Sequence, residues 1–149
     1  MKKTVCLLSA VFCITVLDAQ QFSTKSQETV EQTVVKMFDA LSSRDSVGLK
    51  VFSTADITLF EYGQIWNMDT LILKAITQNK ATDFKRTNNF EFISTTLDKA
   101  TAWLTYRLHS VIIRDGKKVT MQWLETAILV RVKRQWKIKH LHSTLISRS

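Results

Sequence analysis

Three polar residues in the second half of the chain are of types that could do acid–base chemistry together. Arg107 and His109 lie two positions apart, and Glu125 lies in the next segment of alternating apolar residues. A guanidinium can hold a carboxylate through two parallel hydrogen bonds, and histidine titrates near neutral pH, as a general base should. We predict Arg107, His109 and Glu125 as the catalytic residues if the protein is an enzyme. An Arg107–Glu125 ion pair that only stabilises the fold is the alternative.

Four aromatic residues are candidates for the wall of a ligand pocket, namely Tyr62, Trp66, Trp103 and Trp123. Large rings bury much apolar surface, and Tyr and Trp also keep one polar atom that can reach a ligand. Plain core packing fits the same residues. We predict a small-molecule ligand as the partner of this aromatic set.

Metal and cofactor chemistry finds little support in the sequence. His140 and His142 share one face of a predicted strand, but no carboxylate falls beside them on that face. HExxH, GxSxG and CxxC motifs and a glycine-rich phosphate loop do not occur in the sequence. We therefore predict no metal and no cofactor.

Helical spacing of apolar residues is confined to the first half of the chain. It predicts helices over residues 25–42, 46–52 and about 68–79, the last one capped by Asn67. Residues 57–62 predict a short strand that ends at Gly63. These helices would have to cover one face of whatever sheet follows.

Strand patterns dominate the rest of the chain. Residues rich in Thr, Val, Ile, Phe and Trp predict strands over about 84–96, 99–113, 118–132 and 136–147. The pair Asp115-Gly116 predicts a hairpin turn, and Lys133-Arg134-Gln135 predicts a second one. Helices followed by a long antiparallel meander indicate an α+β fold with one domain.

The register of the two hairpins decides which side chains share a face. An odd loop at the first hairpin sets Arg107 opposite Glu125, and a three-residue loop at the second sets Val132 opposite Trp136. Ile128 then faces His140, and Thr126 faces His142. One face, which we predict to be concave, holds Trp103, Arg107, His109, Trp123 and Glu125.

Both faces of the predicted sheet carry many apolar residues, yet three helices can cover only one of them. A second copy of the chain is the simplest cover for the outer face, so we predict a homodimer. A C-terminal turn or a longer loop of the same chain is the alternative.

Two stretches near the end of the chain resemble a known family. They are Trp123-Leu-Glu-Thr-Ala-Ile-Leu-Val and Trp136-Lys-Ile-Lys-His-Leu-His-Ser-Thr. Their order resembles the end of a SnoaL-like, or NTF2-like, domain, and it is similar to the association domain of calcium/calmodulin-dependent kinases. The order of predicted elements agrees with these domains over the whole of residues 20–149.

The resemblance implies an α+β cone, in which three N-terminal helices pack on a curved antiparallel sheet around a pocket. Family members include isomerases, dehydratases and polyketide cyclases, while others only bind ligands or assemble, often as dimers through the outer sheet face. Of the pocket arginines in the kinase domains, one matches Arg107. The others fall at Ala127 and Ser143, which carry no guanidinium, so the resemblance does not carry an arginine cluster over to this chain.

The first residues predict an export signal. Lys2 and Lys3 precede fourteen uncharged residues, and Ala19 offers a small residue at the end of the run. We predict a signal peptide over residues 1–19, a domain over residues 20–149, and a periplasmic or secreted protein. The run is short for a membrane span, so we predict no stable membrane insertion after cleavage. An uncleaved anchor, a lipoprotein signal at Cys13 and a buried N-terminal helix are the alternatives.

The charge of the chain is basic. It has 21 Lys and Arg against 13 Asp and Glu, a net charge of +8, which becomes +7 once Lys2, Lys3 and Asp18 are removed with the signal. Several basic residues gather around the predicted hairpin at 133–135, without the exposed aromatic residues on which bases stack, so we predict no nucleic-acid partner.

Together these features favour an exported domain that binds a small, partly apolar molecule. Two alternatives stay open. The first is an enzyme of the isomerase or lyase type that uses His109 as its base, and the second is a non-catalytic assembly module.

Overall fold

The computed structural model describes residues 25–149, so the predicted signal peptide of residues 1–19 lies outside the described residues. The N-terminal helix covers residues 25–42 within this range. Its buried residues recur every three or four positions and include Val30, Val34, Met37 and Phe38. The sequence predicted this stripe, and burial of the stripe against the sheet stabilises the helix.

Two shorter helical segments follow, as predicted. Helix α2 (Ser46–Phe52) begins after Asp45, whose carboxylate accepts hydrogen bonds from the backbone N–H groups of Val47 and Gly48. Helix α3 (Met68–Ile72) begins after Asn67 and continues into a π-helical turn, η1 (Leu73–Thr77). The predicted helix over 68–79 is therefore present but changes its winding halfway.

Six strands form one sheet in the order β2-β1-β6-β5-β4-β3. Their bounds are β1 (Ser53–Glu61), β2 (Gln64–Trp66), β3 (Lys85–Leu97), β4 (Thr101–Arg114), β5 (Lys117–Val132) and β6 (Gln135–Arg148). The four long strands agree with the predicted ones within two residues or so. Strand β2 was not predicted, and it pairs with β1 after a turn at Tyr62 and Gly63, both of which have positive φ.

The sheet is mixed, whereas the sequence predicted a purely antiparallel one. Strand β1 runs parallel to β6, and the other neighbours are antiparallel. The predicted meander of four long strands is antiparallel, but β1, for which no partner was predicted, reaches the edge of this meander through the helical layer and not through a hairpin. Nothing in the local pattern of β1 indicates which strand it joins or in which direction.

The β4–β5 and β5–β6 hairpins close through two-residue turns, and this corrects the predicted register. Asp115 and Gly116 have positive φ, as do Lys133 and Arg134, a geometry that matches the right-handed twist of the strands. Arg107 therefore lies opposite Leu124, and Glu125 lies opposite Tyr106.

The second hairpin is corrected in part. Val132 pairs with Gln135 instead of Trp136. A register shift between Ile128 and Leu129 then restores the predicted pairs, Ile128 with His140 and Thr126 with His142. Because of this β-bulge, the one-residue error at the turn does not extend to the strand pairs on its far side.

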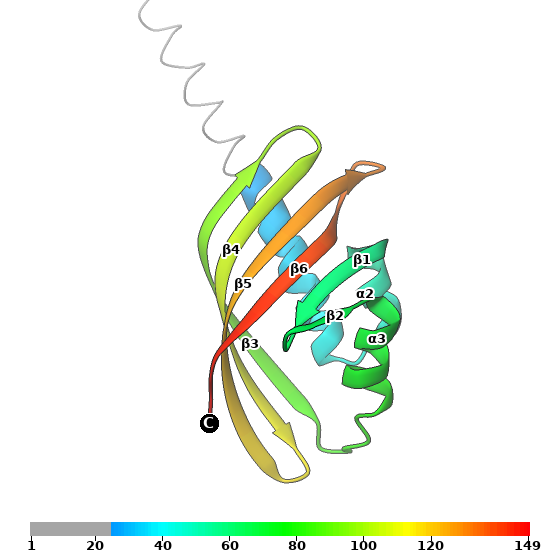
Figure 1. Cartoon of the computed structure of the whole chain (residues 1–149), viewed down its shortest axis with the longest axis vertical. Helices are drawn as coiled ribbons and strands as arrows, with labels where there is room; N and C mark the ends of the chain where they lie inside the picture. Colours follow the sequence, from blue (N-terminus) through cyan, green and yellow to red (C-terminus); the bar gives the residue numbers. More distant parts are fainter. Residues whose placement is uncertain (1–24) are drawn as a thin grey trace, which may run out of the picture.

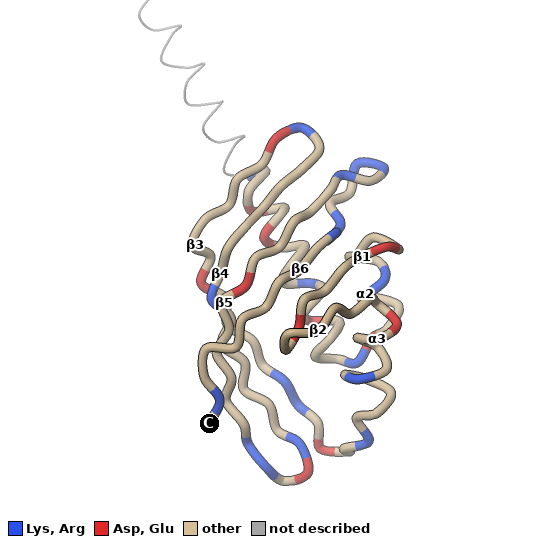
Figure 2. Tube along the Cα trace, in the orientation of Figure 1, with Lys and Arg blue, Asp and Glu red and all other residues tan. Residues whose placement is uncertain are grey.

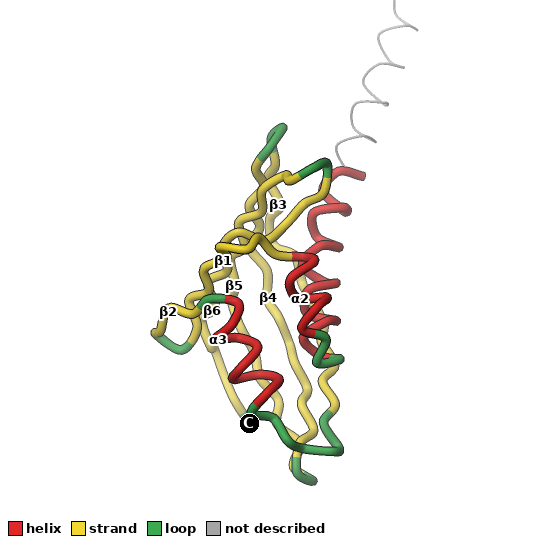
Figure 3. The backbone as a smooth tube through the Cα atoms, turned by 90° about the vertical axis from the view of Figure 1, so that its right-hand side faces the viewer, coloured by secondary structure: helices red, strands yellow, loops and turns green. Residues whose placement is uncertain are grey.

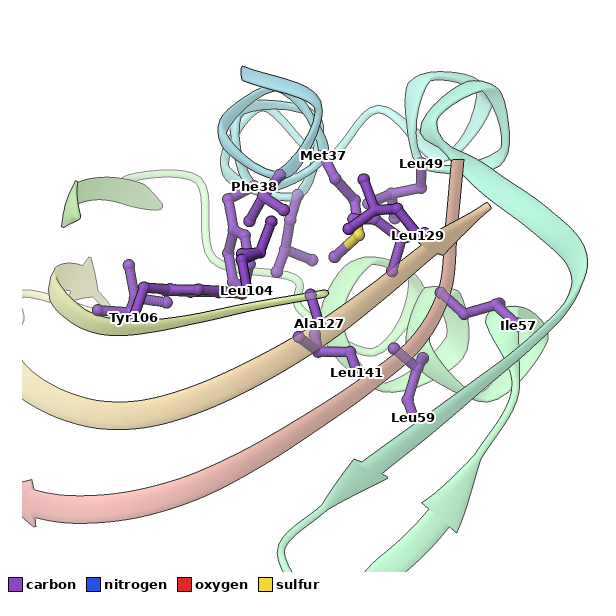
Figure 4. Close-up of a cluster of buried hydrophobic side chains, with 14 of the residues drawn as sticks. Met37, Phe38, Leu49, Ile57, Leu59, Leu104, Tyr106, Ala127, Leu129 and Leu141 are labelled. Carbon is purple, nitrogen blue, oxygen red and sulfur yellow. The ribbon is translucent and has the colours of Figure 1, made fainter. Parts of the chain in front are cut away.

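The curved sheet carries all helices on one side (Figures 1 and 3). Met37 and Phe38 of the N-terminal helix and Leu49 of α2 point toward Leu104 and Leu129 of the sheet (Figure 4). These five side chains are all at least 97% buried. The core therefore fills the space between the helices and the inner face of the sheet, and the remaining space at one end forms the cavity described next.

Candidate functional site

A cavity of about 550 Å³ lies at the end of the molecule where the β4–β5 hairpin turns. Residues of the N-terminal helix, α3, η1 and all six strands line it. Its inner wall is the concave face of the sheet. Its exposed lining residues, which form the mouth, belong to the β1–β2 turn, η1, the β4–β5 hairpin and the end of β6. The β4–β5 hairpin and the end of β6 lie at the lower end of Figure 1. The helices and the curved sheet thus leave a concave space that one layer alone could not form.

Four of the seven predicted site residues line this cavity. They are Glu125, Tyr62, Trp66 and Trp123. Trp123 is 6% exposed and packs edge-on against Tyr62, with ring centroids 5.3 Å apart. The ring centroids of Tyr62 and Trp66 are 6.1 Å apart, so the three rings form one aromatic wall.

The other three predicted residues lie on the outer face, because the true register moves β4 by one residue against β5. Arg107 makes an exposed ion pair of 2.9 Å with Glu91 of β3. His109 is exposed opposite Gln122, and Trp103 is 47% exposed opposite Ile128. The predicted concave placement of Arg107, His109 and Trp103 is therefore wrong, and the predicted Arg107–Glu125 pair does not form.

Arg86 supplies the guanidinium in the inner part of the cavity, and it was not among the predicted site residues. Its Nε donates to Oδ1 of Asn88 at 2.9 Å, and its Nη2 donates to the hydroxyl of Ser110 at 3.1 Å. The guanidinium also lies over the ring of Phe38, 5.4 Å from the centroid. Arg86 makes no ion pair within residues 25–149.

A signal for Arg86 was present in the sequence. Arg86, Asn88, Phe90 and Phe92 alternate along β3, and the two phenylalanines pack against the core. Alternate residues of a strand share a face, so the inward parity of the phenylalanines carries Arg86 and Asn88 inward with them.

Glu125 is the most buried ionisable group of the cavity, with 3% of its surface exposed. Burial raises its pKa to about 7, although the nearby Tyr106 hydroxyl and the positive charge of Arg86 oppose this effect. Oε2 of Glu125 and the hydroxyl of Tyr106 have no hydrogen-bond partner among the described side chains and backbone. A buried carboxyl that is half protonated near neutral pH can both give and take a proton.

A second carboxylate, Glu61, lies beside the first. Its Oε1 accepts a hydrogen bond of 2.7 Å from the hydroxyl of Ser143, which sits opposite Glu125 on β6. Burial raises the pKa of Glu61, and the Ser143 hydrogen bond and the charge of Arg86 act against this. The inner part of the cavity therefore contains two carboxyl groups and one guanidinium.

The mouth of the cavity is basic. Four of its exposed lining residues are cationic against one exposed acid, Asp115; the four are Lys74, Arg114, Lys117 and Arg148. Figure 2 shows Lys and Arg segments gathered around the β4–β5 hairpin and the start of β3. The hairpin is held in place because Asp83 accepts hydrogen bonds from the backbone N–H groups of Asp115 and Gly116.

Residues 25–149 contain neither a metal-binding cluster nor a helix suited to span a membrane. No three His, Cys, Asp or Glu side chains come together there in a way that could hold a metal ion. None of the helices in this range combines the length and the apolar character that crossing a membrane requires.

Several solved structures have the same fold as this chain. An NTF2-like superfamily protein from Salmonella enterica serovar Typhimurium aligns with a TM-score of 0.70 and 15% identity, over 85% of this chain and 94% of that chain. A ketosteroid isomerase-like protein from Erwinia carotovora atroseptica aligns with a TM-score of 0.66 and 13% identity, over 81% and 96%.

The S. rosetta CaMKII hub aligns with a TM-score of 0.67 and 19% identity, over 80% of this chain and 95% of that chain. A comparison with curated proteins found no match. The family comparison is more specific, because residues 30–147 match the model of the SnoaL-like domain. With this match over most of the sequence and the NTF2-like α+β fold, the chain belongs to the SnoaL-like domain family.

Proposed function

We propose that the protein binds a small, partly apolar organic molecule in the cavity between the sheet and the helices. The observation that carries this proposal is the wall of the cavity, in which the aromatic rings of Tyr62, Trp66 and Trp123 stand beside ionisable groups. Natural small-molecule sites are concave, largely apolar and of this size, with a few polar groups that orient the ligand.

Native mass spectrometry of protein purified from its host tests the proposal directly, because a retained ligand appears as added mass. A matched pair of variants then locates the site. Trp123→Leu removes a ring from the cavity, whereas Trp103→Leu removes the same ring from the outer face. We expect the first variant to lose the ligand and the second to keep it.

Two results would contradict ligand binding. One is a protein that carries no ligand and shows no thermal stabilisation with any compound of a broad small-molecule library. The other is equal loss of ligand from both tryptophan variants. An assembly module without a ligand, as the likeness to the CaMKII hub suggests, would then be the better reading.

A second candidate function is proton transfer on the bound molecule, of the isomerase or lyase type. Glu125 favours it, because its pKa of about 7 and its unpartnered Oε2 suit a general acid–base group inside a cavity. His109 was the base that the sequence predicted, and it does not line the cavity. Glu125 is therefore the better candidate.

Exchange in D₂O tests this second function without knowledge of the product. A retained ligand or a library compound that binds is incubated with the protein, and mass spectrometry counts the deuterium gained at carbon. Glu125→Gln should abolish the exchange and retain binding, while His109→Gln should change neither. A bound ligand that gains no deuterium would count against proton transfer at carbon.

We further propose that the protein is exported and dimeric. The export signal predicted over residues 1–19 and the apolar outer face of the sheet support these two statements. The mass of the intact protein isolated from its host tests export, since loss of residues 1–19 shortens the chain and removes both cysteines. A full-length chain found in the cytoplasm would contradict it.

A further inference from the structure

The charges inside the cavity do not balance when all its groups are ionised. Arg86 contributes one positive charge, while Glu61 and Glu125 each contribute a negative one. The guanidinium pairs with neither acid within 4 Å and instead donates to the neutral oxygens of Asn88 and Ser110. A partly buried cation held only by neutral partners keeps much of its capacity to attract an anion.

We propose that the cavity takes a small carboxylate with an apolar body, that Arg86 holds its carboxylate group, and that Glu125 takes up a proton when it binds. The inference rests on the proposed ligand-binding function and names the chemical class of the ligand. In this proposal, an anion and a proton bind to the cavity together.

The guanidinium supports the choice of a carboxylate. Nη1 of Arg86 makes no hydrogen bond to the described part of the chain, and Nη2 has a single acceptor, the hydroxyl of Ser110. A planar fork with free N–H groups matches the two oxygens of a carboxylate better than it matches a single oxygen. The basic mouth adds to this preference, because an excess of positive charge there raises the local concentration of anions.

The aromatic wall supports an apolar body on the same molecule. Tyr62, Trp66 and Trp123 form a continuous surface on which a ring or an alkyl chain can pack. Lys74 lies over the ring of Trp66, 5.2 Å from its centroid, and keeps the outer edge of this wall positively charged. A ligand that places its carboxylate on Arg86 therefore has apolar surface available for the rest of its atoms.

The proton is needed because the ligand brings a third negative charge. With Glu61 and Glu125 both ionised, the interior has a net charge of −1 before binding and −2 after it. Protonation of Glu125 brings the complex back to −1. Burial already raises the pKa of Glu125 to about 7, so near neutral pH this proton is taken up at little cost.

The other groups that face Glu125 do not supply this proton uptake. Tyr106 on β4 and Tyr62 at the β1–β2 turn have pKa values raised by burial, so both hydroxyls stay neutral in the relevant range. Burial lowers the pKa of Arg86, but the charges of Glu125 and Glu61 oppose this and keep it cationic. Burial also raises the pKa of Glu61, but the hydrogen bond from Ser143 and the charge of Arg86 act against this, whereas burial raises the pKa of Glu125 to about 7. Glu125 is thus the group that titrates.

The test uses 3-phenylpropionate and its neutral amide, 3-phenylpropionamide, as probes of equal shape. Isothermal titration calorimetry of each probe at pH 7.5, in two buffers of different ionisation enthalpy, measures affinity and proton uptake together. We expect the carboxylate to bind at least about tenfold tighter than the amide, since hydrogen bonds to charged groups are the stronger ones. Only the carboxylate should bind with proton uptake.

The pH dependence of the unmodified protein gives a second readout that needs no variant. The Kd for 3-phenylpropionate should rise by up to about tenfold per pH unit above about 7, because the proton on Glu125 becomes harder to obtain. The Kd for the amide should stay nearly constant over the same range.

Three variants assign the two roles. Arg86→Gln should remove the preference for the carboxylate, while Arg107→Gln, which removes an exposed guanidinium from the outer face, should retain it. Glu125→Gln should bind the carboxylate without proton uptake and with a Kd that no longer depends on pH. If Arg86→Gln does not fold, the comparison of acid with amide in the unmodified protein still decides the matter.

The possible failures are distinguishable. Binding of the amide as tight as that of the acid, or binding of the acid without proton uptake, would overturn this inference and leave the ligand-binding function in place. Absence of binding by both probes and by every neutral compound of the library would overturn the two together. Binding of other carboxylates with proton uptake, but not of 3-phenylpropionate, would support the inference. It would also restrict which apolar groups the ligand can carry.

Discussion

The carboxyl group of Glu125 lies on the inner face of β5 with 3% of the residue exposed. Removal of a carboxylate from water costs free energy, which the protein avoids by leaving the group protonated. This behaviour makes Glu125 both the titrating group of the cavity and a source of pH-dependent stability.

Stability should fall as the pH rises through the pKa of Glu125. Because burial raises this pKa from 4.5 to about 7, the folded protein binds more protons than the unfolded chain between these values. The contribution is complete below pH 4.5 and is lost as the pH rises through about 7. At pH 8 the loss amounts to roughly 3 kcal/mol in the free energy of unfolding, at about 1.4 kcal/mol per pKa unit.

Glu125→Gln isolates this contribution. The variant should be more stable than the unmodified protein at pH 8 and should lose most of that advantage at pH 5. Urea denaturation at the two pH values measures the difference. A stability gain that is the same at both pH values would show that titration of Glu125 is not its cause.

Arg107 offers a contrasting residue, since its guanidinium and the carboxylate of Glu91 are each more than 60% exposed. Exposed ion pairs contribute little because water screens them and two long side chains must be ordered. Arg107→Gln should therefore lower the free energy of unfolding by less than about 1 kcal/mol. Ligand binding should be unchanged, and a large loss of either would place Arg107 in a role that its position does not explain.

The cavity residues differ in how well the sequence predicted them. Trp123 and Glu125 were placed correctly on the concave face, because they alternate with exposed residues along β5. Arg107 and His109 were placed on the wrong face of β4, since the two-residue turn at Asp115-Gly116 shifts the pairing by one position. This one-position error placed Arg107 on the concave face, whereas Arg86, which lines the cavity, lies on β3 and was not among the predicted site residues.

In helix α2, a glycine allows close packing against the N-terminal helix. A Cβ on Gly48 would lie 2.6 Å from Oδ2 of the capping Asp45 and 2.9 Å from the Cβ of Ala40 on the N-terminal helix. Real Cβ contacts are not this short, so the two helices approach each other over a glycine.

Gly48→Ala should destabilise the protein, although alanine is the better helix former by about 1 kcal/mol. The clash should outweigh this gain and lower the free energy of unfolding by about 1 to 3 kcal/mol. Val51→Ala, on an exposed position of the same helix, is a suitable control and should cost less. Thermal denaturation compares the two, and a stabilised Gly48→Ala variant would contradict this account of the packing.

The elements themselves were largely predictable, and their assembly was not. The helix over residues 25–42 and the four long strands follow local periodicity, which neighbouring residues in the chain determine. The parallel pairing of β1 with β6 and the extra strand β2 depend on contacts between distant segments. No periodicity within residues 53–66 indicates those partners.

For the whole molecule, the outer face of the sheet carries an apolar patch that no described element covers. Its members are between 36% and 47% exposed: Trp103 on β4, Leu124 and Ile128 on the adjacent β5, and Phe60 on β1, which β6 separates from β5. Trp103 and Ile128 are paired across β4 and β5, and these exposed apolar side chains make the outer face a suitable surface for a second copy of the chain.

Trp103→Glu should dissociate the proposed homodimer, because a charge would be buried in the centre of an apolar contact. Size-exclusion chromatography with light scattering should give the molar mass of a dimer for the unmodified protein and that of one chain for the variant. Val47→Glu, on the 70% exposed Val47 of α2, should stay dimeric. A monomeric unmodified protein at high concentration would refute the dimer.

The parallel pairing of β1 with β6 has a further consequence for the order in which the chain can fold. Glu61 and Ser143, which join these strands by a hydrogen bond, are 82 positions apart. During synthesis, β1 and the helices around it are made before β6, so the sheet cannot close on them until β6 has been made. Long-range pairing of this kind is slow. We therefore expect the nascent chain to lack its closed sheet for most of its synthesis. A chain in this state can still be threaded through a narrow translocation pore.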